Sequence, residues 1–232
     1  KARLFRQYPL GPVAAHAIGY INRINKRDLE MIEEDDQAAN YKGTDHIGKT
    51  GLEQRYEYQL HGETGYEQVE IDAGGRASRS LSRTAPVQGN NLTLTLDVKL
   101  QEMAEKAFGD RRGALVAIEP ATGGILALVS APSFDPNLFV DGIRSDDWEL
   151  LNNSPDRPML NRALNGAYPP GSTFKPFMAL AALETGKRTA GQTIADPGVF
   201  NFGGHQFRDD KKGGHGTVDM YKSIVHSCDT YY

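Results

Sequence analysis

The chain is organised around Tyr168-Pro169-Pro170-Gly171-Ser172-Thr173-Phe174-Lys175-Pro176, which leads into an apolar run at residues 177–184. Two prolines and a glycine cannot continue a helix from upstream, whereas the apolar run predicts a buried helix that ends at Gly186. Ser172 is therefore predicted to lie in the first turn of this helix. Lys175 follows three residues later, so the two side chains share one face.

A serine and a lysine on one helix face can act as a nucleophile and its base. A serine hydroxyl is a poor nucleophile until a neighbour takes its proton. Lysine can take that proton only when it is neutral, a form that burial and nearby positive charge favour. The helix N-terminus adds backbone N–H groups suited to an oxyanion. The four-residue pattern alone would indicate a first-turn serine and a solvated lysine, but its Pro-Pro-Gly flank and apolar helix favour the catalytic interpretation.

Length and composition indicate a globular protein and argue against several partners. The 232 residues can form one large domain or two small ones, with 39% hydrophobic and 24% charged residues. A net charge of −4 without a basic stripe predicts no nucleic-acid partner. No apolar run is long enough to span a membrane, and Lys1-Ala2-Arg3 does not open a signal peptide. The single cysteine excludes an internal disulfide. We expect a segment cut at both ends.

The chain before residue 89 is polar and of mixed character. Residues 8–20 suggest a turn, a short helix and a strand, and residues 28–39 predict an exposed, charge-rich helix. Residues 67–73 alternate like a strand and are followed by a turn at 74–76. Gly89-Asn90-Asn91 then marks a domain boundary.

The chain after this boundary is more apolar. Residues 92–96 alternate like a half-buried strand, and Asp97 can cap an amphipathic helix behind it. Residues 113–119 and 125–130 are nearly all apolar and predict a hairpin buried on both faces, central in a sheet with helices around it. Trp148, the only tryptophan, is predicted to be a packing anchor.

A second serine motif, Ser227-Cys228-Asp229, follows on a helix predicted to begin at Thr217. Residues two apart on an ideal helix point about 200° apart. Ser227 and Asp229 can therefore converge on one site only if the backbone breaks there. Alone the pair indicates a helix surface; with Ser172 and Lys175 upstream, we expect it to complete a catalytic site.

Asn161-Arg162-Ala163 through Lys175-Pro176 resembles the active-site segment of the class B penicillin-binding proteins, and residues 92–137 and 227–229 fit the same family. The chain as a whole is most similar to the elongation-type group. The resemblance implies a multidomain α+β chain: a polar α/β pedestal of the dimerisation type at 1–88, and the N-terminal part of a transpeptidase domain at 89–232. That domain is β-lactamase/transpeptidase-like, an antiparallel sheet flanked by helices.

The family also carries a third motif, a Lys-Thr-Gly strand late in the catalytic domain. Lys49-Thr50-Gly51 lies far upstream of the serine motifs, and we interpret it as a coincidence. The strand that binds the substrate carboxylate and supplies an oxyanion N–H is therefore absent from these residues.

The resemblance implies a serine-type peptidoglycan D,D-transpeptidase that cross-links stem peptides during cell elongation and is a target of β-lactams. Ser172 would be the nucleophile and Lys175 its base. Ser227 would relay protons, and Asp229 would bind the lysine or the substrate amide. A serine β-lactamase and a β-lactam sensor domain are the alternatives.

The implied partners are peptidoglycan stem peptides, β-lactams, a SEDS-family glycosyltransferase and other proteins of the elongation machinery. The implied location is the bacterial inner membrane, with a single-span anchor outside this segment and the catalytic part in the periplasm.

The residues themselves, rather than a family motif, predict a structural zinc site. A lone cysteine is usually a buried filler, but Cys228 follows a glycine-rich segment with few apolar residues that contains three aspartates and two histidines. A thiolate, an imidazole and two carboxylates would complete a closed four-coordinate site and tie this segment to the second motif. The predicted ligands are Asp196, Asp209, His215 and Cys228, with Asp210, His205 and His226 as substitutes.

Overall fold

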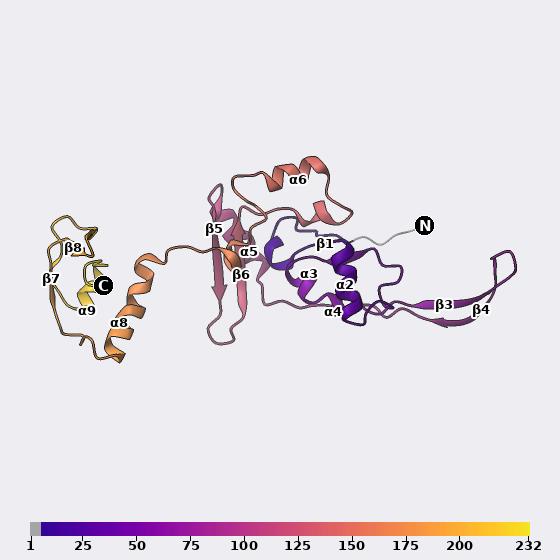
Figure 1. Ribbon diagram of the computed structural model, residues 1–232, viewed down its shortest axis with the longest axis horizontal. Helices are drawn as coiled ribbons and strands as arrows, with labels where there is room; N and C mark the ends of the chain where they lie inside the picture. The colour runs from indigo at the N-terminus through magenta and orange to yellow at the C-terminus, as the bar shows by residue number, and fades with distance from the viewer. Residues whose placement is uncertain (1–5) are drawn as a thin grey trace. The chain divides into compact units, whose positions relative to one another are not determined.

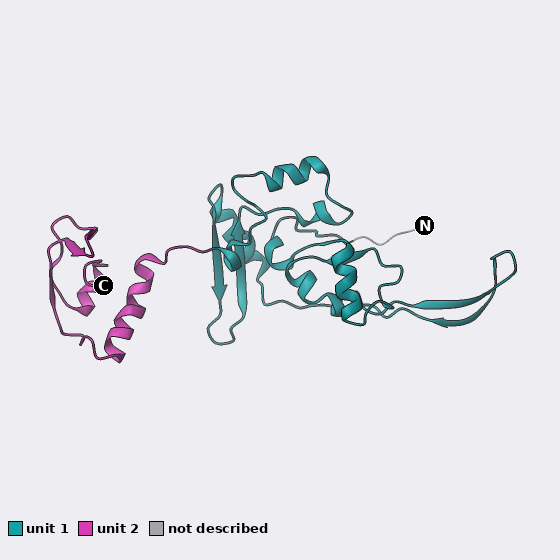
Figure 2. Cartoon of the chain, in the orientation of Figure 1, with its two compact units in different colours: residues 1–166 teal, residues 167–232 magenta. Residues whose placement is uncertain are grey.

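The chain forms two compact units, Lys1–Gly166 and Ala167–Tyr232, in a computed structural model that describes residues 6–232 (Figure 2). The opening residues considered above for a signal peptide lie outside the described range. The predicted boundary between residues 1–88 and 89–232 is a different division and stays a prediction. No helix within residues 6–232 is long and apolar enough to cross a membrane.

The first part of unit 1, up to His61, consists of short helices and a two-stranded sheet (Figure 1). Its elements are α1 (Ala15–Ile18), β1 (Ile21–Arg23), α2 (Lys26–Glu34), β2 (His46–Gly48), α3 (Gly51–Arg55) and α4 (Glu57–His61). Strands β1 and β2 pair antiparallel. The capping box of Asn25 and Asp28 starts α2, because each side chain accepts a hydrogen bond from the other residue's backbone N–H. The helix predicted at 28–39 is therefore present, but it begins earlier and ends at Glu34.

Lys49-Thr50-Gly51 has a structural explanation within unit 1. Lys49 forms an ion pair with the buried carboxylate of Asp28. Gly51 has a φ of 61°, and a Cβ atom there would lie 2.6 Å from the backbone oxygen of Ala17. The glycine is required because two backbone segments cross at this point.

A long hairpin of β3 (Tyr66–Ile71) and β4 (Ala77–Thr84) extends from this part of unit 1 (Figure 1). The predicted strand and turn are confirmed. The carboxylate of Asp72 closes the turn by accepting hydrogen bonds from the backbone N–H groups of Gly74 and Arg76.

The rest of unit 1 is built on α5 (Val98–Phe108) and the antiparallel hairpin of β5 (Gly113–Ile118) and β6 (Ile125–Ala131). Asp97 caps α5 as predicted. The strand predicted at 92–96 is absent, because no neighbouring strand pairs with that segment. Only β6 is deeply buried, whereas β5 is largely exposed, so the predicted burial on both faces is wrong for β5.

Residues 132–166 complete unit 1. They contain η1 (Pro136–Phe139), α6 (Ser145–Asn152) and α7 (Arg162–Asn165). Leu151 of α6 packs against a core that includes Phe134 and Phe139. Trp148 is 43% exposed, so its predicted role as a packing anchor is wrong. Leu151 rather than Trp148 fixes α6 to the core.

Unit 2 contains two short antiparallel sheets, β7 with β10 and β8 with β9. Its elements are η2 (Gly171–Phe174), α8 (Lys175–Glu184), β7 (Ile194–Asp196), β8 (Val199–Phe202), β9 (His205–Arg208), β10 (Gly216–Val218) and α9 (Met220–Val225). The helix predicted from Thr217 begins instead at Met220, because Asp219 caps it and Thr217 pairs in β10. It stops at Val225, so residues 226–232 form turns.

Candidate active site and metal centre

Ser172 lies in the 3₁₀ turn η2, which runs directly into α8. This differs slightly from the predicted first turn of an α-helix. The turn can start sharply because Gly171 adopts a φ of 56°, and Pro176 fits the first turn of α8, where its missing N–H is not needed. Lys175, the first residue of α8, is buried.

The ammonium of Lys175 is held by the second serine motif. Its Nζ donates to Ser227 Oγ at 3.0 Å, to the backbone oxygen of Ser227 and to Asp229 Oδ1. These three acceptors match the three N–H donors of a lysine. The contact of Lys175 with the Asp229 carboxylate, whose side chain is half exposed, is one of the two contacts expected for Asp229. A lysine accepts a proton only in its neutral form, so Lys175 must be neutral at the moment it takes the proton of Ser172.

Ser227 adopts a φ of 56°, in the left-handed region. Helix α9 has already ended at Val225, so the break that the Ser227–Asp229 spacing requires is present. The hydroxyl of Ser227 donates to Ser172 Oγ at 2.7 Å. The structure thus brings together all four residues that were predicted to be catalytic.

An open pocket of about 600 Å³ adjoins these side chains. Its lining residues are Gly171, Ser172, Phe174, Lys175, Met178, Asp229 and Tyr232. A chain of hydroxyl, hydroxyl and amine beside a pocket can move a proton away from Ser172 while its oxygen attacks a bound carbonyl.

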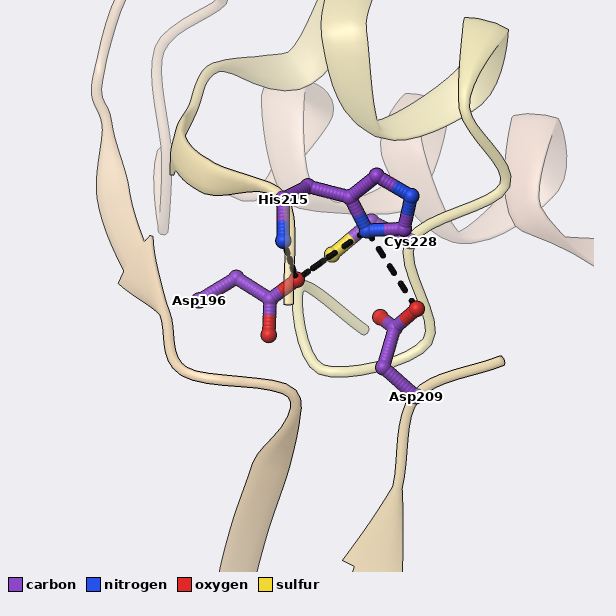
Figure 3. A group of neighbouring side chains, drawn as sticks. All are labelled: Asp196, Asp209, His215 and Cys228. Atoms are coloured by element: carbon purple, nitrogen blue, oxygen red, sulfur yellow. Dashed lines mark hydrogen bonds and ion pairs between the residues drawn. The ribbon is translucent and has the colours of Figure 1, made fainter. Parts of the chain in front are cut away.

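The four predicted metal ligands also lie close together, and one of them, Cys228, belongs to the second motif (Figure 3). Their candidate ligand atoms all lie within 4.8 Å of one another. His215 Nδ1 lies 3.1 Å from Asp196 Oδ2 and 3.3 Å from Asp209 Oδ1, and Cys228 Sγ lies 3.4 Å from Asp196 Oδ2. Ligands about 2.0–2.3 Å from a tetrahedral zinc ion are separated by roughly 3.3–3.8 Å, so these three distances lie close to that range.

The electrostatics of this cluster also favour a cation. The side chains of Asp196 and Asp209 are fully buried, and His215 is the only described basic side chain paired with either. Burial alone would raise the pKa of Asp196, but hydrogen bonds from Thr230, Gly198 and His215 hold it well below its usual range. Two buried negative charges with one imidazole leave an excess that a divalent cation would neutralise.

Residues of this cluster also form hydrogen bonds with the second serine motif and the residue after it. Asp209 Oδ2 accepts the backbone N–H of Asp229 at 2.8 Å. Thr230 Oγ1 donates to Asp196 Oδ1 at 2.7 Å, and the sequence reasoning missed this residue. Its only signal was its position directly after the motif. Asp229 and Thr230 are thus held by two of the candidate ligands, Asp209 and Asp196.

Comparison with known families agrees with this geometry. Residues 1–94 match the penicillin-binding protein dimerisation domain, and residues 113–232 match the penicillin-binding protein transpeptidase domain. The chain belongs to the penicillin-binding protein transpeptidase family. Its fold is the expected α+β combination of these two domain types.

The chain is also similar to individual proteins of this family. The chain is 47% identical, over 98% of its length, to the peptidoglycan D,D-transpeptidase MrdA of Escherichia coli strain K12, but it spans only 36% of that protein. It is similar to the crystal structure of Pseudomonas aeruginosa PBP2 in complex with WCK 5153 (TM-score 0.85, 44% identity, 99% of this chain and 46% of that chain). It is also similar to Helicobacter pylori PBP2 in a complex with MreC (TM-score 0.85, 36% identity, 98% and 41%).

Proposed function

We propose that this chain carries the nucleophile-bearing part of a peptidoglycan D,D-transpeptidase and that Ser172 forms its acyl-enzyme. The observation that carries the proposal is the contact of Ser227 Oγ with both Ser172 Oγ, at 2.7 Å, and Lys175 Nζ, at 3.0 Å. The likeness to MrdA supports the same reaction.

In the first step Ser172 Oγ attacks the carbonyl carbon of the penultimate D-alanine of a stem peptide. Its proton passes through the Ser227 hydroxyl to Lys175 in its neutral form. The peptide C–N bond breaks, and the proton returns to the departing amine, which leaves as D-alanine. Backbone N–H groups, including that of Ser172, stabilise the oxyanion.

In the second step the amine of another stem peptide attacks the Ser172 ester. The amine's proton goes back through the same relay to Ser172, and the new amide is the cross-link. A β-lactam would enter the first step and leave Ser172 acylated.

A serine β-lactamase and a β-lactam sensor would also be acylated at Ser172. A β-lactamase needs a group that activates the deacylating water, and no clear candidate stands between the two motifs. The lifetime of the acyl-enzyme with a fluorescent penicillin, combined with an assay for released D-alanine, separates the three. A long-lived adduct with D-alanine release supports the transpeptidase; rapid penicillin turnover, or an adduct without D-alanine release, contradicts it.

The Asp196, Asp209, His215 and Cys228 cluster binds a structural zinc ion in this proposal. A metal would neutralise the two buried carboxylates and replace the thiol proton, which burial otherwise retains by raising the pKa of Cys228 to about 11. The closed ligand set leaves no open position, so the ion would hold the loop rather than take part in the reaction.

The family likeness also suggests an assembly. An elongation-machinery partner is supported by the H. pylori PBP2 complex with MreC, and a SEDS-family glycosyltransferase by the resemblance to the elongation-type group. A single-span inner-membrane anchor and a periplasmic catalytic part belong to the same proposal. Co-purification of the full-length protein with membranes and with these partners tests it.

A further inference from the structure

A second pocket, of about 490 Å³, lies in unit 1 and contains none of the catalytic or metal residues. It is lined by Tyr20, Asn22, Asn25, Lys49, Phe139, Ile143, Ser145 and Trp148. Pockets of this size, with apolar walls and a few polar groups, are typical small-ligand sites.

Aromatic rings form one side of the pocket. Tyr20 stacks on the buried Phe139 with ring centroids 4.0 Å apart, which fixes the tyrosine ring. Trp148 from α6 is 43% exposed and lines the same pocket. The faces of such rings carry partial negative charge, so they attract the weakly positive C–H groups on the flat face of a sugar.

The polar lining offers free donors on Asn22, Asn25 and Lys49, beside the hydroxyls of Tyr20 and Ser145, which can donate or accept. Asn22 Oδ1 already accepts from the backbone N–H of Arg23, and Asn25 Oδ1 accepts from that of Asp28. Neither amide nitrogen has an acceptor among residues 6–232. Lys49 uses one N–H on Asp28 and keeps two. Acceptor oxygens on a ligand would satisfy these free donors.

The charge of the pocket selects a neutral ligand. Lys49 is the only charged residue in the lining, and its ion pair with the buried Asp28 carboxylate already balances it. An anion would gain little net attraction here. An acetamido carbonyl is a strong neutral acceptor, and the sugar that carries it has an apolar face for the aromatic wall.

We propose that this pocket binds a saccharide bearing N-acetyl groups, with a sugar ring against Trp148 and an acetamido oxygen on the donors of Asn22 and Lys49. The site goes beyond the proposed reaction, because it would hold the glycan rather than the stem peptide. Assigning the natural ligand to the glycan strands of peptidoglycan rests on the proposed function; the binding of an N-acetylated sugar does not.

The pocket provides its own reporter because Trp148 is the only tryptophan in the chain. The experiment titrates the protein with chitotetraose, with cellotetraose as a matched sugar that lacks acetamido groups, and follows tryptophan emission and its quenching by iodide. Chitotetraose should shield Trp148 saturably and at least about tenfold more tightly than cellotetraose. No saturable change, or equal binding of the two sugars, overturns the proposal.

Two variants test the contacts. Asn22→Asp keeps the acceptor for Arg23 N–H but removes the donor, so chitotetraose should bind about three- to tenfold more weakly. Leu150 lies on α6, the helix that carries Trp148, but outside the pocket lining, so Leu150→Ala should bind chitotetraose as the wild type does. Wild-type affinity in Asn22→Asp, with an unchanged circular dichroism melt, contradicts the assignment.

A last arm separates this inference from the proposed function. Peptide-free glycan strands should compete with chitotetraose, while acylation of Ser172 by penicillin should be unaffected by Asn22→Asp. Absent sugar binding with normal acylation overturns the pocket alone. Normal chitotetraose binding without competition by glycan strands overturns the peptidoglycan assignment.

Discussion

The hydroxyl of Ser227 lies 2.7 Å from the hydroxyl of Ser172, although the two residues are 55 positions apart in the chain. This contact depends on the left-handed backbone at Ser227, which lies just after the end of α9 at Val225. With this backbone the Ser227 hydroxyl contacts both Ser172 and Lys175. Lys175 reaches Ser227 but forms no described hydrogen bond with Ser172. Ser227 is therefore the bridge between nucleophile and base.

Replacing this bridge should slow acylation without unfolding the protein. In Ser227→Ala the proton of Ser172 loses its route to Lys175, and we expect penicillin acylation to fall by about 10²- to 10⁴-fold. Stopped-flow acylation rates measure the loss. Ser80→Ala is a matched serine substitution away from the relay, since Ser80 is an exposed residue of β4 in unit 1. A Ser227→Ala rate within threefold of the wild-type rate contradicts the bridging role.

Lys175→Arg tests whether the amine acts as a base. Guanidinium keeps the positive charge but does not release its proton in proteins, so acylation should be abolished. The same acylation assay applies, with Lys187→Arg as a charge-conserving control outside the site. A Lys175→Arg rate above about a tenth of wild type would cost under about 1.4 kcal/mol of barrier, too little for the loss of a base.

Protein purified without added metal should contain close to one zinc ion per chain. Cys228→Ser should lose most of it, because it removes the thiolate from a closed ligand set. His205→Ala is the control, since His205 is an exposed residue of β9 outside the cluster. Elemental analysis decides the matter: less than a few tenths of a zinc per chain, or equal zinc in wild type and Cys228→Ser, would show that the cysteine is a buried filler.

The stability of unit 1 should depend on pH through Tyr8. Burial, followed by the nearby Glu53 charge, raises the pKa of Tyr8 above its usual value. Its hydroxyl donates to Glu53 and accepts from Ile21 N–H, so Tyr8→Phe should destabilise unit 1 by about 1–3 kcal/mol at pH 8.

The sign of this pH dependence follows from the raised pKa. The contribution of Tyr8 is complete below about pH 10, its unfolded pKa, and is lost as pH rises toward the folded value. Urea unfolding between pH 8 and 11.5 should therefore show the wild type and Tyr8→Phe converging above pH 10. A stability difference that stays constant or widens over that range refutes this account.

Features that depend on neighbouring residues were predicted correctly from the sequence more often than the pairing of distant segments. Asp97 capped α5 as expected, because capping depends on the residues directly beside it. The break at Ser227 was inferred as a geometric condition, since two residues two apart had to face one site. Residues 92–96 alternate like a strand, yet they have no partner strand, and pairing cannot be read from one segment.

Other features depended on tertiary contacts that no local pattern reports. Trp148 was assigned to the core on residue type alone, but Leu151 makes the core contact of α6. The contact of the Asp229 carboxylate with Lys175 was one of the two contacts predicted for Asp229. The hydrogen bonds of Thr230 and Asp209 could not be predicted, because they depend on how the loop folds.

Ser172 is the residue that we expect penicillin to acylate. Intact-protein mass spectrometry after incubation with benzylpenicillin detects this adduct, in the full-length protein so that the complete domain is present. The mass of the wild type should rise by one penicillin, with the adduct mapped to the peptide that contains Ser172, and the mass of a folded Ser172→Ala variant should not change. An adduct on Ser172→Ala, or on a wild-type peptide without Ser172, would contradict the assignment.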